Sequence, residues 1–467
     1  MMKLYKKIFL IILFICFIVG QASYAITEKP EKSEQNKDVL QSTVTEYNND
    51  IHSVFSLKDC VNIAIKYNPQ IRAYIYNEQV YKSQIGQAWA NYFPEISAGF
   101  DVSRTRNHYS GKNIPSFYRS MSYTMGYVPT VSADMLLFDF GKTKAMADYA
   151  KRVYESKQED TKENINDIIY NIKSAYFNIL FAKAQVMVYE DTVKDYEMQL
   201  SQAEAFYAIG KKARIDIVTA EYNLGKAKLN LVSAKNTLQV AHVQLSQIMG
   251  IPEYTNYELS DELTLNEYEE TFENLIKTAY DVRPELMSYK KMVDAAKMNL
   301  RAQKRNFTPN LGVYGSFGNG IGNQYDLRSA QIGLQLNYSG FNIMRQKKQV
   351  DEAKAEYNKT IAEYDYAKDT IYLNVKKNYL DLKTARESII IAKLALDEAK
   401  EQYRQVTGRY KAGVGDAIEL KDGENTYLNA RLDFYNAMLN YNVTAASLEK
   451  EVGVPLKFSD KKIFEKL

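Results

Sequence analysis

The chain has 467 residues, of which 46% are hydrophobic and 25% are charged, so its composition is that of a folded protein and not of a disordered one. Lysine and arginine total 60 against 57 aspartates and glutamates, and three of the lysines lie in the first 25 residues. Without those lysines the chain is formally neutral, which argues against nucleic acid as a partner.

Few residues of this chain suggest catalysis or metal binding. Beyond residue 25 the only cysteine is Cys60, which excludes an internal disulfide and a cysteine metal site. The histidines His52, His108 and His242 are far apart in sequence and lie in no ligand motif. Because nucleophile motifs, phosphate loops and paired-carboxylate hydrolase patterns are also missing, we expect no enzyme, no cofactor and no metal site.

The first 25 residues predict a secretory signal peptide. Three lysines precede an apolar run, which small residues follow: Lys3, Lys6 and Lys7, then residues 8–20, then Ser23 and Ala25. A run of about 13 apolar residues is short for a membrane span, so we predict cleavage, with a retained N-terminal anchor as the alternative. Cys16 follows Phe14 and Ile15 and not the small residue of a lipoprotein site, so we expect no lipidation. The polar residues 26–55 predict a flexible leader.

An internal repeat organises the rest of the chain into two halves, residues 56–252 and 271–455. An offset of 215 residues aligns Pro69 with Pro284 and Pro94 with Pro309. An offset of 203 residues aligns two glycine corners, "YAIG" ending at Gly210 and "YKAG" ending at Gly413. Residues 253–270 connect the two halves, and residues 456–467 form a C-terminal tail.

The periodicity predicts one helical hairpin in each half, over about 141–250 and 341–452. Apolar and small residues recur at spacings of three and four from Ile165 to Tyr207, which is the pattern of a coiled-coil seam. Large and small residues alternate along the two return helices, where Gly423 occupies a small position unless it breaks the helix. No stretch beyond residue 25 approaches 18 consecutive apolar residues, so we expect no helix to cross a bilayer.

Helix lengths predict how the helices of each half pack together. The first long helix, ending near Ala208, would be about 100 Å long, and the return helix only about 60 Å. A further helix between Pro69 and Tyr92 supplies nearly the missing length. We therefore predict that two short helices stack end to end beside each long one.

Four segments alternate between apolar and polar residues over about ten positions each, namely 95–104, 123–138, 310–318 and 327–339. This pattern is typical of transmembrane β-strands, and the alternative is an exposed hairpin on a soluble sheet. Four strands cannot close a membrane barrel, and an open edge in lipid leaves backbone groups unpaired. Either the strands lie outside a membrane or several protomers share one barrel. Three protomers would supply twelve strands beside a ring of helices, a fold that is mainly α with a β-barrel portion.

Several motifs identify a family in the same order in which the elements occur. They are "LKDCVNIAIKYNPQI" at 57–71, "LLFDFGKTKA" at 136–145, the two glycine corners, and "NARLDFYNAMLNYNVTAASLEKEVGVP" at 429–455. The chain thereby resembles the outer-membrane efflux proteins of TolC type over nearly all of its mature length. The resemblance implies a homotrimer with a shared 12-stranded β-barrel in the outer-membrane lipid of a diderm bacterium. It also implies a helical barrel in the periplasm, with a collar built from 253–270 and the chain ends.

The function implied by this resemblance is transport. Such a protein is the passive exit duct of a tripartite efflux pump or a type I secretion system, and it receives cargo from a periplasmic adaptor and an inner-membrane transporter. Drugs, metal ions and unfolded polypeptides are all compatible cargoes. The alternative is a secreted coiled-coil scaffold or adhesin without channel activity.

The resemblance also assigns roles to residues at the glycine corners, which become the periplasmic tips. The adaptor-contact residues are Ile209, Gly210 and Lys211 in the first corner and Ala412, Gly413 and Val414 in the second, with Lys211 where the family has an aliphatic residue. Glu419 and Asp422 correspond to an acidic ring at the aperture, and three residues apart on a helix they share one face.

In the closed state of the family, an arginine beyond the second corner contacts a tyrosine and an aspartate. Those two partners correspond here to Tyr410 and Asp216, but the arginine position is occupied by Gly415. Arg409 and Arg214 are the candidates to replace the missing arginine.

Overall fold

A computed structural model describes residues 54–105, 124–252, 257–260, 266–268, 270–322, 326–338, 342–456 and 458–462. The expected signal peptide and nearly all of the expected leader lie outside these residues. The chain divides into two units, and the smaller one contains β1 (Val54–Phe55) and residues 256–258, with the rings of Phe55 and Tyr257 5.0 Å apart. The larger unit, residues 56–255 and 259–467, contains every element discussed below. The short strand β4 (Glu258–Leu259) lies at the boundary.

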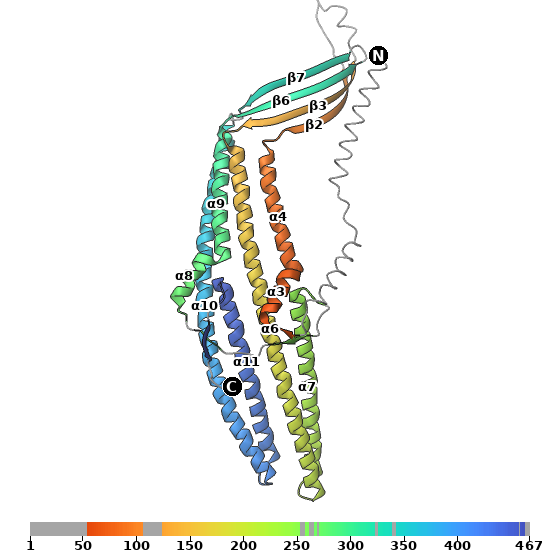
Figure 1. The fold of residues 1–467 in the computed structure, drawn as a ribbon, viewed down its shortest axis with the longest axis vertical. Helices are drawn as coiled ribbons and strands as arrows, with labels where there is room; N and C mark the ends of the chain where they lie inside the picture. The colour runs from red at the N-terminus through yellow and green to blue at the C-terminus, as the bar shows by residue number, and fades with distance from the viewer. Residues whose placement is uncertain are drawn as a thin grey trace, which may run out of the picture. The chain divides into compact units, whose positions relative to one another are not determined.

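The first repeat contributes four helices, α3 (Leu57–Tyr67), α4 (Pro69–Ala90), α6 (Lys142–Ala208) and α7 (Arg214–Met249). A capping box between Ser56 and Asp59 begins α3. Asn68 precedes a proline and therefore has extended backbone angles, φ −63° and ψ 121°, which separate α3 from α4. Both α4 and α7 pack along α6 (Figure 1), so the predicted stacking of short helices beside a long one is observed.

The second repeat has the same plan, with α8 (Phe272–Val282), α9 (Pro284–Lys304), the 3-10 helix η1 (Arg305–Phe307), α10 (Ile343–Lys411) and α11 (Ala417–Val452). Arg283 takes the place of Asn68, with φ −61° and ψ 122°, and separates α8 from α9. Both α9 and α11 pack along α10. The described helices therefore form two tandem copies of one supersecondary arrangement.

Four antiparallel strands form the main sheet in the order β2 (Glu95–Thr105), β3 (Thr124–Phe138), β6 (Asn310–Gly322) and β7 (Asp326–Asn337). One face of this sheet exposes apolar side chains, among them Ile96, Phe100 and Leu334. The strand β6 continues to Gly322, beyond the expected end at 318, because Asn319 and Ile321 still pair with Arg328 and Asp326 of β7. Backbone pairing there extends a strand whose Gly-Asn sequence predicted a loop.

A second, small sheet joins the segment between the repeats to the C-terminal tail. The strand β5 (Asn266–Tyr268) pairs antiparallel with β8 (Phe458–Lys462).

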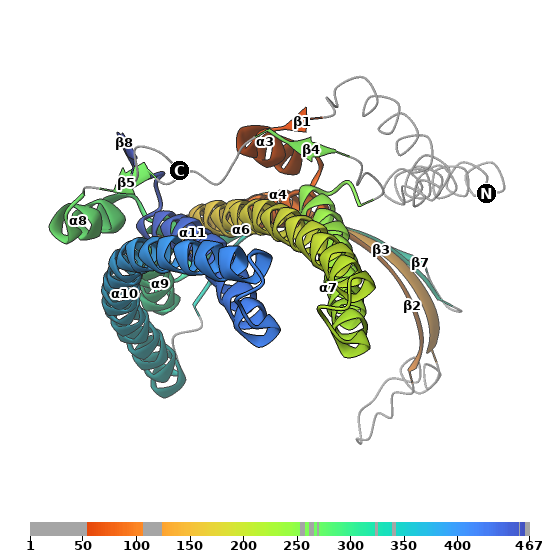
Figure 2. The same cartoon turned by 90° about the horizontal axis from the view of Figure 1, so that it is seen from below.

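The long helix α6 lies between neighbours on both sides. In the half of the unit that carries the glycine corners, the packing order is α10, α11, α6, α7 (Figure 2). Gly423 does not break α11, because the helix continues through it to Val452. A Cβ atom at Gly423 would lie 2.7 Å from Val406 Cγ2, so a larger residue would displace the Val406 side chain where α10 and α11 approach. Among the described residues, no helix is both long and apolar enough to cross a membrane.

Candidate tip and aperture site

The two glycine corners have the same backbone. Gly210 has φ 76° and Gly413 has φ 77°, the left-handed conformation that glycine adopts without steric cost. In the first corner, Gly210 N donates to Tyr207 O at 2.9 Å and Lys211 N donates to Phe206 O at 2.9 Å. Gly413 N and Val414 N make the equivalent bonds at 3.0 and 3.1 Å. Both corners are therefore Schellman motifs that end the long helices.

Aspartates begin the return helices that follow the corners. Asp216 Oδ2 accepts from Ala213 N at 3.0 Å, and Asp416 Oδ1 accepts from Ile418 N at 3.4 Å. A carboxylate in the first turn stabilises a helix because it pairs with the unsatisfied N–H groups. Asp216 thus has a structural role at the start of α7 in addition to the role expected from the resemblance.

All six expected adaptor-contact residues are exposed: Ile209, Gly210, Lys211, Ala412, Gly413 and Val414. The apolar side chains are largely accessible, with Ile209 64% and Val414 73% exposed. Two further exposed residues, Ile215 and Ile418, lie in the first turns of α7 and α11 and were not predicted as contact residues. Their signal in the sequence is the repeated triplet of isoleucine, acid and aliphatic residue.

The structure brings Tyr410 and Asp216 to the same place through a third residue, Lys212. The Lys212 Nζ atom lies 5.1 Å from the centre of the Tyr410 ring and 4.0 Å from Asp216 Oδ1. Tyr410 is buried, and burial together with the Asp216 charge raises the pKa of its hydroxyl. Lys212 occupies the position in the first corner that Gly415 occupies in the second, and the sequence did not single it out.

Gly415 leaves no space for a side chain in this corner. A Cβ atom there would lie 2.7 Å from Tyr410 N and 2.9 Å from Arg409 C, which are backbone atoms. Within the described part of the protomer, neither expected substitute forms an ion pair with Asp216. Arg409 points to Glu419, with an ion pair of 3.7 Å, and Arg214 forms no ion pair within the described residues.

Glu419 and Asp422 both lie near the start of α11, where Asp422 is exposed and Glu419 partly so. Glu419 forms an ion pair with Arg409, whereas no described cation pairs with Asp422. Among the residues that the structure describes, no group of three or more histidines, cysteines or carboxylates is placed to hold a metal ion.

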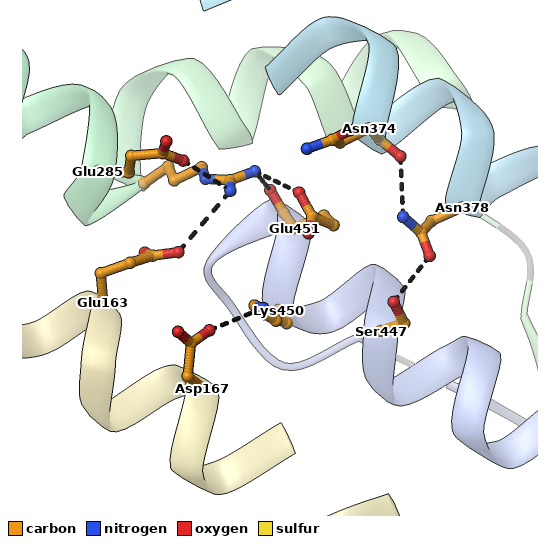
Figure 3. A network of polar contacts seen from close by, with 9 residues as sticks. Glu163, Asp167, Glu285, Asn374, Asn378, Ser447, Lys450 and Glu451 are labelled. Carbon is orange, nitrogen blue, oxygen red and sulfur yellow. Dashed lines mark hydrogen bonds and ion pairs between the residues drawn. The ribbon is translucent and has the colours of Figure 1, made fainter. Parts of the chain in front are cut away.

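A buried ionic cluster lies where the short helices of the second repeat meet α6. Arg283 is only 4% exposed and pairs with Glu451 at 2.7 Å, Glu285 at 2.7 Å and Glu163 at 3.7 Å. Burial raises the pKa of Glu163 to about 7 despite the nearby arginine. Figure 3 shows these glutamates from three helices, beside the ion pair of Lys450 with Asp167 at 2.7 Å.

The first repeat has a simpler junction at the equivalent place. Asn68 Nδ2 donates to Ile248 O at 2.6 Å, as Arg283 Nη1 donates to Glu451 O at 2.9 Å. Both residues therefore join the end of a return helix to the junction between the two preceding short helices of the same repeat. The sequence signal that could have identified them is a polar residue before each of the two aligned prolines.

These hairpins, corners and strands define a duplicated helical protein with a shared four-stranded sheet. The family model described as "Outer membrane efflux protein" matches residues 60–251 and 275–454, which are the two repeats and more than half of the chain. The chain belongs to the outer membrane efflux protein family.

Individual relatives are distant but match over most of their length. The chain is 20% identical over 408 residues to the probable efflux pump outer membrane protein TtgC of Pseudomonas putida, covering 85% of this chain and 83% of the relative. It is 22% identical over 418 residues to the alkaline protease secretion protein AprF of Pseudomonas aeruginosa, covering 85% of this chain and 84% of the relative. The solved structure of the Campylobacter jejuni CmeC outer membrane channel superposes with a TM-score of 0.72 at 17% identity, covering 87% of each chain.

Proposed function

We propose that this protein is the outer-membrane exit duct of a tripartite efflux pump or a type I secretion system. The observation that carries the proposal is that both repeats match the family and that the chain covers more than four fifths of the relatives above. Those relatives are named for an efflux pump and for protease secretion, so both classes of machine fit. The duct has no chemistry of its own, and its cargo is set by the transporter and adaptor that it joins.

A homotrimer is supported by the two helices at the ends of the packing order, α7 and α10. Each exposes an apolar row at spacings of seven or fourteen residues: Tyr222, Leu229 and Val243 on α7, and Tyr366, Leu373, Leu380 and Leu394 on α10. Such rows are coiled-coil seams without a partner in the protomer. We propose that α7 of one copy packs on α10 of the next, a head-to-tail contact that closes into a ring.

The sheet supports the same assembly and a membrane location. Its outer strands β2 and β7 each pair on one side only within the described sheet. Ile332, Leu334 and Leu336 project from alternate positions of β7 and are exposed. In the proposed trimer, β7 of one copy pairs with β2 of the next, twelve strands close a barrel, and these apolar side chains contact outer-membrane lipid.

The glycine corners are the proposed docking surface for the periplasmic adaptor. Exposed apolar residues at the end of a helical hairpin, here Ile209, Ile215, Val414 and Ile418, are suited to contact another protein. The test is cross-linking from cysteines at Lys211 and Val414, with a cysteine at exposed Lys354, in the first turns of α10, as the control. We expect adaptor capture from the two corners and none from Lys354. Failure of both corner cysteines to capture a periplasmic adaptor would contradict the docking assignment.

Glu419 and Asp422, with Asp216 and Tyr410, are the proposed aperture residues. Three copies of the acidic pair would place six carboxylates around one constriction and attract cations. Replacing both acids with alanine should raise leak conductance in planar bilayers or weaken block by multivalent cations. Glu401→Ala, an exposed acid on α10, is the control that should leave both unchanged. Unchanged block and conductance in the double variant would remove these residues from the aperture.

The alternative function, a secreted scaffold or adhesin, makes a different biochemical prediction. A scaffold would stay soluble when membranes are sedimented. The duct should sediment with outer membranes, require detergent for extraction, and migrate as a trimer that dissociates on heating.

A further inference from the structure

The two hairpins contact each other along α6 and α11, and each hairpin also packs internally. Near the corners, α6 packs on α7 through a cluster of Val193, Leu224 and Ala227 with Tyr196. Likewise α10 packs on α11 through Val406, Tyr410 and Leu420. Between the hairpins, side chains of α6 and α11 meet through polar pairs: Arg431 with Asp191 at 2.9 Å, Lys450 with Asp167 at 2.7 Å, Lys173 with Glu449, and Glu424 with Gln199. Polar pairs therefore run along the seam between α6 and α11.

Glu424 is the buried acid of this seam near the corners. Its side chain belongs to α11 and is 3% exposed. Gln199 Nε2 of α6 donates to both carboxyl oxygens, at 3.1 and 3.2 Å. None of the ion pairs formed by the described residues involves Glu424. An ionised carboxylate without a cation is costly to bury, whereas a neutral carboxylic acid with hydrogen bonds is not.

The charged groups around Glu424 add no direct counter-ion. The titratable or charged groups that face this cluster are Asp195 and Tyr196 from α6, Tyr403 and Lys411 from α10, and Arg431 from α11. Asp195 Oδ2 accepts a hydrogen bond from the Tyr403 hydroxyl at 3.3 Å. The negative charge of Asp195 disfavours ionisation of Glu424 and so raises its pKa. Lys411 and Arg431 act on Asp195, and Arg431 is already paired with Asp191.

We propose that Glu424 is a proton-operated latch between the two hairpins. The neutral acid holds α11 on α6 just above the corners, and loss of its proton releases that contact. The inference rests on the geometry of one protomer and does not depend on the proposed duct function.

The direction of the pH response follows from proton binding in the two states. Burial raises the pKa of Glu424 to about 7 in the joined seam, from an ordinary value of 4.5. In a separated seam the carboxyl is solvated and ionises near its ordinary value. The joined state therefore binds more protons between about pH 4.5 and pH 7, and its stability falls as pH rises through this window. Above the window the seam stays in its loosened state.

A distance measurement between the hairpins tests the latch. Spin labels would be placed at exposed Glu204 on α6 and exposed Lys421 on α11, in full-length protein with Cys16→Ala and Cys60→Ala, diluted with unlabelled chains to one labelled copy per assembly. Double electron–electron resonance at pH 5 should give one short distance. At pH 8 a longer distance should appear, with about a tenfold or greater rise in the ratio of long to short.

Two variants separate the latch from a general effect of pH. Glu424→Gln keeps a hydrogen-bonding group opposite Gln199 but cannot ionise, so its distance distribution should be the same at both pH values. Asp433→Asn, an exposed acid on the same helix, should keep the wild-type response. Gln199→Lys supplies a cation opposite Glu424, so the seam should stay joined at pH 8.

Three outcomes would overturn the proposal: one distance at both pH values in the wild type, a pH response that persists in Glu424→Gln, or a wild-type response in Gln199→Lys. Because the readout is a distance within the chain, these outcomes are independent of whether the protein conducts. A failed latch with successful adaptor capture would leave the duct function intact, and the reverse result would leave the latch intact.

Discussion

The two glycine corners share a backbone but not a chemistry. The φ angles of Gly210 and Gly413 differ by one degree, and the two Schellman hydrogen bonds of the first corner have counterparts in the second. The side chains that follow are basic in the first corner, with Lys211, Lys212 and Arg214, whereas the second has Val414, Gly415 and Ala417 at the same positions. The turn needs only a left-handed glycine and two backbone hydrogen bonds. The exposed side chains around it are therefore free to diverge.

One pair of equivalent positions diverges for a steric reason. Gly415 lies against the backbone of Arg409 and Tyr410, whereas the equivalent Lys212 has space to extend over the Tyr410 ring. The cation that lies over Tyr410 therefore comes from the first corner.

Gly415→Arg should disrupt the second corner most strongly. A Cβ atom 2.7 Å from Tyr410 N forces the backbone to move, at a cost of roughly 1–3 kcal/mol. Hydrogen exchange of the amides in residues 409–420 should accelerate accordingly. The matched control is Gly408→Arg, at a helical glycine with no neighbour within 4 Å, which should be neutral or stabilising. Equal exchange in the two variants would show that the corner tolerates an arginine at 415.

Gly210→Ala and Gly413→Ala should each cost about 1–2 kcal/mol, because both glycines have left-handed φ and neither has a neighbour within 4 Å. The two costs should agree within about 0.5 kcal/mol, since only backbone strain is involved. Hydrogen exchange at each corner measures these two costs. The control is Gly225→Ala, at a position inside α7 with no neighbour within 4 Å, which should stabilise the protein by about 1 kcal/mol. Clearly unequal costs would mean that the corners are not equivalent turns.

The fold was largely predictable because its signals are periodic and occur twice. The seam from Ile165 to Tyr207 predicted Ile168, Ile172 and Ile179 as buried residues, and they are. A second buried row on α6 was missed, namely Tyr176, Leu180, Ala184, Val188 and Thr192. That row recurs at every fourth residue and not at alternating spacings of three and four, so it does not follow the coiled-coil pattern. It exists because α6 packs between neighbours on both sides.

The residues of the candidate tip and aperture site could be predicted only where the sequence pattern occurs in both halves of the chain. The glycine corners could be read from the sequence, but Glu424 could not, because a charged residue in a charged helix is normally exposed. Lys212 was missed for a different reason. Its partner Tyr410 lies almost two hundred residues away, and no local pattern places the first corner beside the second.

Lys212→Met should weaken the contact between the corners by about 0.5–1 kcal/mol, the usual range for a partly exposed cation–π pair. Combining it with Tyr410→Leu in a double-mutant cycle isolates the pair from the loss of packing. The same cycle with exposed Lys211→Met should give no coupling energy. Coupling between Lys211 and Tyr410, or none between Lys212 and Tyr410, would contradict the arrangement.

Arg409→Gln should have the smallest effect, below about 0.5 kcal/mol, because its ion pair with Glu419 is long at 3.7 Å and both side chains are about half exposed. Any effect should disappear in about 1 M salt, where exposed charges are screened beyond roughly 3 Å. The measurement is again hydrogen exchange in residues 409–420, with Glu419→Gln expected to match it. If Arg409→Gln cost more than Lys212→Met, the cation that joins the two corners would be Arg409, and Lys212 would be an incidental neighbour of Tyr410.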